Sequence, residues 1–375
     1  LTADLIEVTV PTEMLLGTVA IDHIRLENAR LVIHRQADGS SNLPSAESSR
    51  DAGPPSALPV QRIEIPRLAV DVADIGSGMS LSLPNIAVDV RREAGQLRLV
   101  EPGRFSSGSR ATTVRTLGGG VAFDGRSVRL SQFTATTDEA EATLDGEIAL
   151  LVSNPNLDLR LSGRGNVAEL ARWATSEAVP AGTLTFDAGI NGLLSSPAID
   201  SRVRSGALAY QGLTVSRIDA ALKVDSNRLE ATRVEMSLAE GQVTAAGQLS
   251  FGSSTANLTA SWSEVSLEQL GRMITGRRSP MPAGRATGRA SFAGAPSDLA
   301  TWTVDVSNRI VAASGSAGLL PVGGEASFNV AEGRWRLQGM HVIAGAGIGT
   351  ALMGDVVPHD VMHSSLTGTI EARDT

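Results

Sequence analysis

Two histidines in the C-terminal part of the chain have the spacing of a zinc-binding motif. In His359-Asp-Val-Met-His363 the imidazoles are four residues apart, so on a helix they would share one face. An Asp stands where a metalloprotease has its catalytic Glu, Pro358 precedes the pair, and strand-like sequence surrounds it. No third ligand is evident beyond His341. We therefore expect two solvent-facing histidines, no metal site and no cofactor.

Two further segments could in principle carry out chemistry. Gly345-Ala-Gly-Ile-Gly349 is rich in glycine but lacks the spacing and the βαβ context of a dinucleotide-binding loop, and a tight turn is expected there. The carboxylates of Asp138, Glu139 and Glu141 cluster on what reads as a solvated loop. A glycosidase pair stays open as an alternative, because some β-solenoids are polysaccharide-cleaving enzymes, but nothing singles out two carboxylates.

Charge and composition narrow the function classes further. The chain has 375 residues, and 32 Lys and Arg against 40 Asp and Glu give a net charge of −8. An acidic chain whose basic groups are as isolated as Arg91-Arg92 and Arg277-Arg278 is a poor candidate for binding nucleic acid. The absence of cysteine excludes disulfides, thiolate zinc sites and cysteine nucleophiles. No catalytic residues emerge, so we expect a protein that is not an enzyme.

The dominant pattern is the alternation of apolar and polar residues that characterises strands with one buried and one solvated face. Turn signals such as Asp124-Gly125 and Asn191-Gly192 separate the runs. Aromatic residues make up only 3% of the chain, which suits stacked β layers better than one compact core. The alternating runs include Ile63/Ile65, Leu68/Val70/Val72, Ile86/Val88/Val90, Leu157/Leu159/Leu161, Ile218/Ala220/Leu222/Val224, Val234/Met236/Leu238 and Leu258/Ala260/Trp262.

An internal repeat of about 100 residues organises the chain. Short helices are predicted at 166–175 and 266–275, each opened by a capping residue, Asn166 or Ser266. Pro180-Ala-Gly leads to a glycine at position 192, and the same tripeptide starting at Pro282 leads to a glycine at 294. We expect N-terminal strands at 1–43, a flexible Pro/Ser-rich loop at 44–60, and repeats at 61–179, 180–279 and 280–375, the last truncated.

Two segments resemble the AsmA-like proteins, including the long TamB group. The segment 15–43 combines paired short strands, a basic residue (Arg35), an Asp38-Gly39 turn and the dipeptide Asn42-Leu43. The segment Pro180-Ala-Gly-Thr-Leu, followed by Gly192-Leu-Leu-Ser-Ser-Pro-Ala-Ile199, is similar to the repeat punctuation of TamB. The resemblance implies a bridge-like lipid-transfer protein, in which a curled sheet shields phospholipid acyl chains in an apolar β-groove.

The same resemblance implies a place in the cell and a set of partners. Such proteins act in the periplasm of Gram-negative-type bacteria, in outer-membrane biogenesis, anchored in the inner membrane and in some cases joined to an outer-membrane protein. The chain starts at Leu1 and shows no anchor, so an anchor is expected outside it. The uncharged run 342–354 is too short and too rich in glycine to span a membrane.

The expected fold is therefore all-β: an elongated, repeating, curled β-sheet, like a β-solenoid with an open groove, with short capping helices. Alternation identifies the inside of such a sheet but does not show whether it is hollow. A closed-core structural or adhesive solenoid that binds a protein or glycan remains the alternative, with a polysaccharide-active β-helix enzyme third. The residues expected to line the groove are Leu157, Leu159, Leu161, Ile218, Leu222, Val224, Leu258, Trp262, Val304 and Val306.

Overall fold

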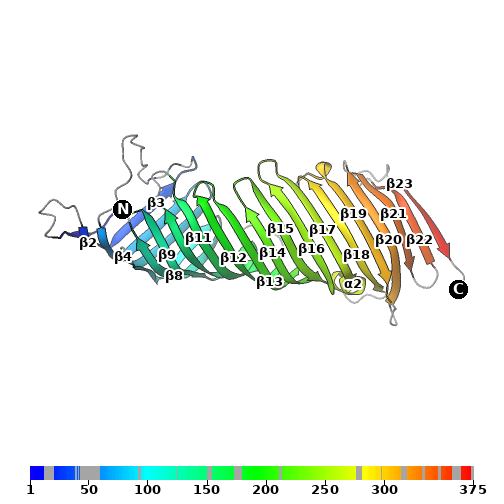
Figure 1. The fold of residues 1–375 in the computed structure, drawn as a ribbon, viewed down its shortest axis with the longest axis horizontal. Coiled ribbons are helices and arrows are strands. Elements are labelled where there is room, and N and C mark those ends of the chain that lie inside the picture. The colour runs from blue at the N-terminus through cyan, green and yellow to red at the C-terminus, as the bar shows by residue number, and fades with distance from the viewer. Residues whose placement is uncertain are drawn as a thin grey trace. The chain divides into compact units, whose positions relative to one another are not determined.

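The computed structural model bears out the expected fold class, a repeating all-β sheet with short helices, and strands make up 79% of it. The chain divides into two compact units, each of which has most of its packing within itself. Figure 1 labels their strands and colours them by residue number. Unit 1 is Leu1–Glu177 with Thr185–Ile199, and unit 2 is Ala178–Leu184 with Asp200–Thr375. The residues described are 1–11, 21–38, 40, 42, 60–91, 94–124, 126–149, 154–172, 180–210, 213–275, 281–296, 298–313, 319–331, 334–344, 348–356 and 365–372.

Unit 1 combines parallel and antiparallel pairing. β2 and β3 both run parallel to the long strand β4, one beside each half of it, and Asn28, with φ 49°, makes the break between them. Each strand from β8 to β10 pairs antiparallel with the next one along the chain, and β8 also makes a single parallel contact with β5. The strands are β1 (Leu5–Thr9), β2 (Ile21–Glu27), β3 (Ala29–Arg35), β4 (Val60–Asp74), β5 (Met79–Arg91), β6 (Gln96–Glu101), β7 (Gly103–Ser107), β8 (Arg110–Phe123), β9 (Ser127–Thr137), β10 (Ala140–Ala149) and β11 (Asn156–Asn166).

Unit 2 is a meander, in which each strand from β14 to β23 pairs antiparallel with the next. A short parallel contact between Met281–Ala283 and Leu319–Pro321 also joins β18 to β20. β12 (Ala181–Leu193) and β13 (Ala198–Tyr210) contribute residues to both units. The others are β14 (Leu213–Val224), β15 (Arg228–Leu238), β16 (Gly241–Ser250), β17 (Thr255–Ser266), β18 (Met281–Gly294), β19 (Thr303–Ala312), β20 (Leu319–Ala331), β21 (Arg334–Ala344), β22 (Ile348–Val356) and β23 (Ser365–Ala372).

The two predicted helices are present and are shorter than expected. They are α1 (Val167–Ala171) and α2 (Leu267–Thr275), and a 3-10 turn occupies Leu299–Thr301. Both expected caps form: Asn166 Oδ1 accepts from the Ala168 and Glu169 amides, and Ser266 Oγ accepts from the Gln269 amide at 3.2 Å. In a capping box the side chains of Glu169 and Gln269 would accept from the N-cap amides. Here they have other partners: Glu169 pairs with Arg172, and the Gln269 side chain donates to Glu240.

The segment that carried the N-terminal resemblance folds back on β3. The Asn42 side chain donates to the Val32 carbonyl at 2.9 Å and accepts from the His34 amide at 2.8 Å. Asp38 accepts from the hydroxyl and amide of Ser40, and these hydrogen bonds lower the pKa of its carboxyl group. Apart from Val60, which starts β4, the predicted loop 44–60 lies outside the described residues.

Candidate functional site

In unit 2 the strand register collects apolar side chains on one face of the sheet, which we call the apolar face. Directly paired residues of antiparallel strands point to the same side, and alternate residues to opposite sides. Three rows cross β16 to β20 on this face. They are Val243–Trp262–Gly288–Asn308–Ala326, Ala245–Ala260–Ala290–Val306–Phe328 and Gly247–Leu258–Phe292–Val304–Val330.

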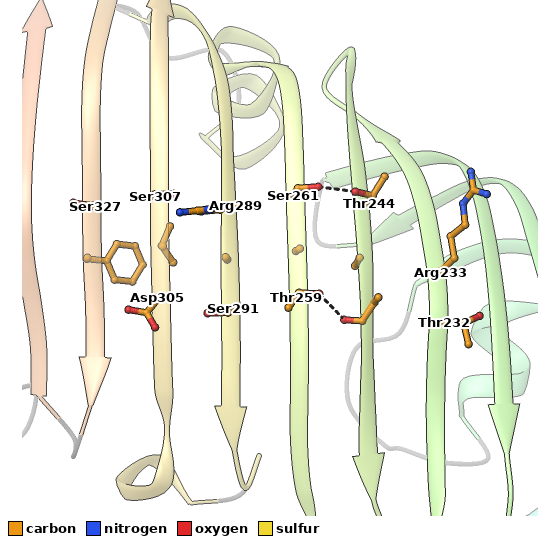
Figure 2. A pocket seen from close by; sticks show the side chains of 16 residues that line it. Thr232, Arg233, Thr244, Thr259, Ser261, Arg289, Ser291, Asp305, Ser307 and Ser327 are labelled. Carbon is orange, nitrogen blue, oxygen red and sulfur yellow. Dashed lines mark hydrogen bonds between the residues drawn. The ribbon is translucent and has the colours of Figure 1, made fainter.

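The middle row carries alanine on three consecutive strands, β16 to β18, before Val306 and Phe328, and we call it the alanine row. Ala245, Ala260 and Ala290 are each flanked by rows that contain Trp262, Leu258 or Phe292. Because alanine side chains project less far from the backbone than the larger ones beside them, they form the floor of a shallow groove, which we call the trough. A depression of about 810 Å³ lies at this level of the sheet, and its lining includes the whole row together with polar residues of the same strands, such as Thr244, Ser261 and Arg289 (Figure 2).

The centre of the apolar face is open. Leu258 is 49% exposed, and Ala260, Ala290 and Val306 are only half-buried. Side chains at such positions are fully buried when a second sheet packs on them. The sheet in this region therefore presents apolar surface that no described residue covers completely.

Along the strand direction, the apolar face is limited at one end by α2 and at the other by an aromatic pair. Towards one end α2 packs Leu267, Leu270 and Met273 against a small core of Ala239, Val265 and Ala286. Towards the other end the ring of Trp302 meets Phe292 edge-on, with centroids 5.2 Å apart and planes at 83°. On β18, Gly288 and Ala290 lie between Ala286 and Phe292, so the trough runs between the helix and the aromatic pair.

The opposite face of unit 2 is polar. Thr244 and Ser261 on neighbouring strands share a hydrogen bond of 2.6 Å, and Figure 2 shows further hydroxyl and charged residues on adjoining strands. On β13 and β14 Arg202 pairs with Asp219, and this hydrogen bond lowers the pKa of the carboxyl group. One face of the sheet is thus hydrated and the other is apolar.

All seven groove residues predicted in unit 2 lie on the apolar face. Leu222 and Val224 pair with Ala231 and Leu229, and Ile218 lies opposite Met236 at a β-bulge. The remaining four belong to the three rows defined above: Leu258, Trp262, Val304 and Val306. Whether they contact lipid remains a prediction.

The three residues predicted in unit 1 also share a face, but their environment differs. Leu157, Leu159 and Leu161 pair with Ile148, Gly146 and Leu144 on β10. Leu157 and Leu159 are each 7% exposed, so this part of unit 1 is a filled core and not an open surface. Leu161 is half-buried.

The three candidate carboxylates, Asp138, Glu139 and Glu141, are each paired separately. Asp138 pairs with Arg115 at 2.6 Å, which lowers the pKa of its carboxyl group, and Glu141 pairs with Arg164 at 3.0 Å. Glu139 accepts from the Thr112 hydroxyl. Each carboxylate therefore has its own partner, and the lowered pKa of Asp138 is the reverse of what a general acid needs. His359 and His363, with most of the 345–349 turn and the His341 side chain, lie outside the described residues.

Two wider searches over the described part of the chain gave negative results. No three His, Asp or Glu side chains there come together as metal ligands. None of the helices there has the length and apolar character to cross a membrane.

Sequence reasoning missed three features of this face. Alternation does not reveal that the alanines of neighbouring strands align in one row, because register is set by turns and bulges. Nor does it show that α2 packs on the apolar face. It also passed over Asn308, a polar residue at an apolar-face position, although the break in the alternation Val304, Val306, Asn308, Ile310 was a visible signal.

Comparison with known proteins gives no relative. No protein-family model matches the chain, and it has no match among curated proteins or solved structures.

Proposed function

We propose that the chain binds the acyl chains of phospholipids on the apolar face of unit 2 and, as part of an AsmA/TamB-like protein, shields them during transport between the membranes of a Gram-negative-type envelope. The observation that carries the proposal is the continuous apolar face from β14 to β20 with its open centre. The sequence resemblance described above points to the same activity and to a location in the periplasm.

The energetics of an acyl chain suit such a surface. Exposing one CH₂ group to water costs about 0.8 kcal/mol, so a chain of 16 carbons costs on the order of 12 kcal/mol. A trough of alanine and glycine lined by Leu258, Trp262 and Phe292 can cover the acyl chain through apolar contact alone, without a specific binding site for any one group. Shielding of this kind involves no bond making or breaking, so the proposed protein is not an enzyme.

The alternative of a structural or adhesive solenoid that binds a protein or glycan is less well supported at this surface, at least for a protein segment that would bind by adding a strand. A peptide adds to a sheet through an unpaired strand edge, whereas β14 to β22 are each paired on both sides, apart from any part of β14 that faces β13. The filled core at Leu157 and Leu159 does favour closed packing locally, so we restrict the lipid surface to unit 2.

The test is site-specific photocrosslinking at two adjacent residues of β17. Leu258 lies on the apolar face and Asn257 on the polar face, and both are exposed. A benzophenone amino acid at position 258 should form lipid adducts, detected by mass spectrometry after expression in a Gram-negative host. The same group at position 257 should form none. Equal labelling at both positions, or no lipid at either, would contradict the proposal.

A charge placed on the face gives a second test. Leu222→Glu should remove lipid that co-purifies with the detergent-free protein, because covering a carboxylate with an acyl chain strips it of water without giving it a partner. Leu222 is half-buried, so a folded variant is expected, whereas Leu159→Glu would introduce a charge into a filled core. Lys223→Glu, on the opposite face, is the control and should leave bound lipid unchanged.

A further inference from the structure

Among its described residues the apolar face carries one side-chain amide, that of Asn308, and the N–H groups of this amide donate to no described residue. Among the described and paired positions of this face from β15 to β20, Asn308 is the one with an amide. Its Oδ1 accepts a hydrogen bond of 3.0 Å from Trp262 Nε1. Its Nδ2 has no hydrogen-bond partner among the described residues, and it is not one of the fully buried atoms that lack a partner, so it keeps some contact with solvent.

The position of Asn308 relative to the trough is fixed by three neighbours. Gly288 and Ala326 pair with it across the sheet, and Val306 of the alanine row is two residues away on the same face. Trp262 lies over Gly288, since a Cβ built on Gly288 would come within 2.7 Å of the indole ring. The indole thus holds the amide oxygen, and small or apolar side chains surround the amide nitrogen.

An amide donor in such a place has a chemical consequence. An N–H group that loses water without gaining an acceptor costs about 1–3 kcal/mol. An acyl chain alone offers no acceptor, so covering Asn308 with methylene groups would incur that cost. A lipid whose carbonyl oxygen lies over Asn308 avoids it and gains a hydrogen bond.

Resting on the proposed function, we infer that Asn308, oriented by Trp262, donates a hydrogen bond to the ester carbonyl of a diacyl glycerolipid and so selects ester-linked lipids from ether-linked ones on the apolar face. Asn308 acts here as a specificity residue at the border of the trough. The alanine row then accepts the chain that leads away from the carbonyl.

The test is a competition between two lipids that differ only in the carbonyl. The full chain is offered an equimolar mixture of diacyl phosphatidylcholine and its dialkyl ether analogue with the same chains, and native mass spectrometry counts the bound molecules. We expect the wild type to bind the ester lipid about fivefold more, which corresponds to about 1 kcal/mol. A ratio near one would overturn the inference and leave lipid binding standing, whereas binding of neither lipid would overturn the proposed function as well.

One variant and a control complete the design. Asn308→Leu removes the amide donors without placing a charge on the apolar face, and it should lower the ratio to about one while total binding persists. Asn257→Leu removes an amide from the polar face and should retain the fivefold ratio. Retention of that ratio by Asn308→Leu would refute the role of Asn308.

Discussion

Gly288 shows how closely single residues are constrained on the apolar face. A Cβ there would lie 2.4 Å from the Ser307 carbonyl oxygen and 2.7 Å from the Trp262 ring, and real Cβ atoms do not approach backbone so closely. The indole can pass over β18 and reach Asn308 because position 288 has no side chain.

Gly288→Ala should therefore destabilise unit 2 by about 1–3 kcal/mol, the usual cost of overpacking. Urea unfolding followed by hydrogen exchange of β17 to β19 measures the effect. Gly252→Ala is the matched control, because nothing lies within 4 Å of a Cβ at that exposed turn. Equal stability of the two variants would show that Trp262 does not rest on Gly288.

Ion pairs between β4 and β5 of unit 1 predict a loss of stability in acid. Arg62 donates to Asp89 at 2.8 Å, and this hydrogen bond lowers the pKa of Asp89 below its usual value of 3.8. A lowered pKa in the folded state stabilises it fully above about pH 5, and this contribution is lost as the pH falls through about 4 and below.

Asp89→Asn should accordingly lower the urea midpoint at pH 7 and show a shallower fall between about pH 5 and pH 2 than the wild type. Asp22→Asn, at an exposed β2 position with no ion pair among the described residues, should follow the wild-type curve. Parallel curves for wild type and Asp89→Asn would contradict the assigned cause of the shift.

At the scale of elements, the start of α2 could be predicted from the sequence, but its packing could not. Its start followed from Ser266 and the apolar spacing, since capping is local chemistry. Its packing against Val265 and Ala286 depends on residues of several different strands, and no local pattern contains that information. The same holds for α1, whose Asn166 cap was predictable although the helix ends earlier than expected.

Ser266→Ala should destabilise α2 by about 1 kcal/mol, the typical value of an N-cap. The expected result is faster amide exchange across residues 267–275 while β15 and β16 keep their protection. Ser263→Ala, an exposed serine of the same strand, serves as the control. Unchanged exchange in α2 would mean that tertiary packing alone fixes the helix.

At the scale of the molecule, hydrogen bonds between strands are almost all local in sequence. In unit 2 each strand from β14 pairs with the next one along the chain. The alternation of Leu258, Ala260 and Trp262 was enough to predict strands and to assign faces. The difference between an open unit 2 and a filled core at Leu159 was not predictable, because it depends on what packs over a face and not on the face itself.

Packing that stays largely within a unit predicts unfolding in more than one step, as in other repeat proteins. Leu159→Ala should cost about 2–4 kcal/mol and accelerate exchange in unit 1, while Val265→Ala should act on unit 2. Hydrogen exchange at increasing urea concentration resolves the two responses. A single transition that both variants shift equally would show that the chain unfolds as one cooperative body.

The strand order of unit 2 also has a consequence for how the chain is made. From β14 onward a new strand finds its partner in the hairpin that has just formed, so no strand must wait for a distant segment. A chain threaded end-first through a narrow export channel could therefore fold as it emerges, one hairpin at a time. Each finished strand would serve as the template for the next, and unpaired edge would be limited to the strand formed last.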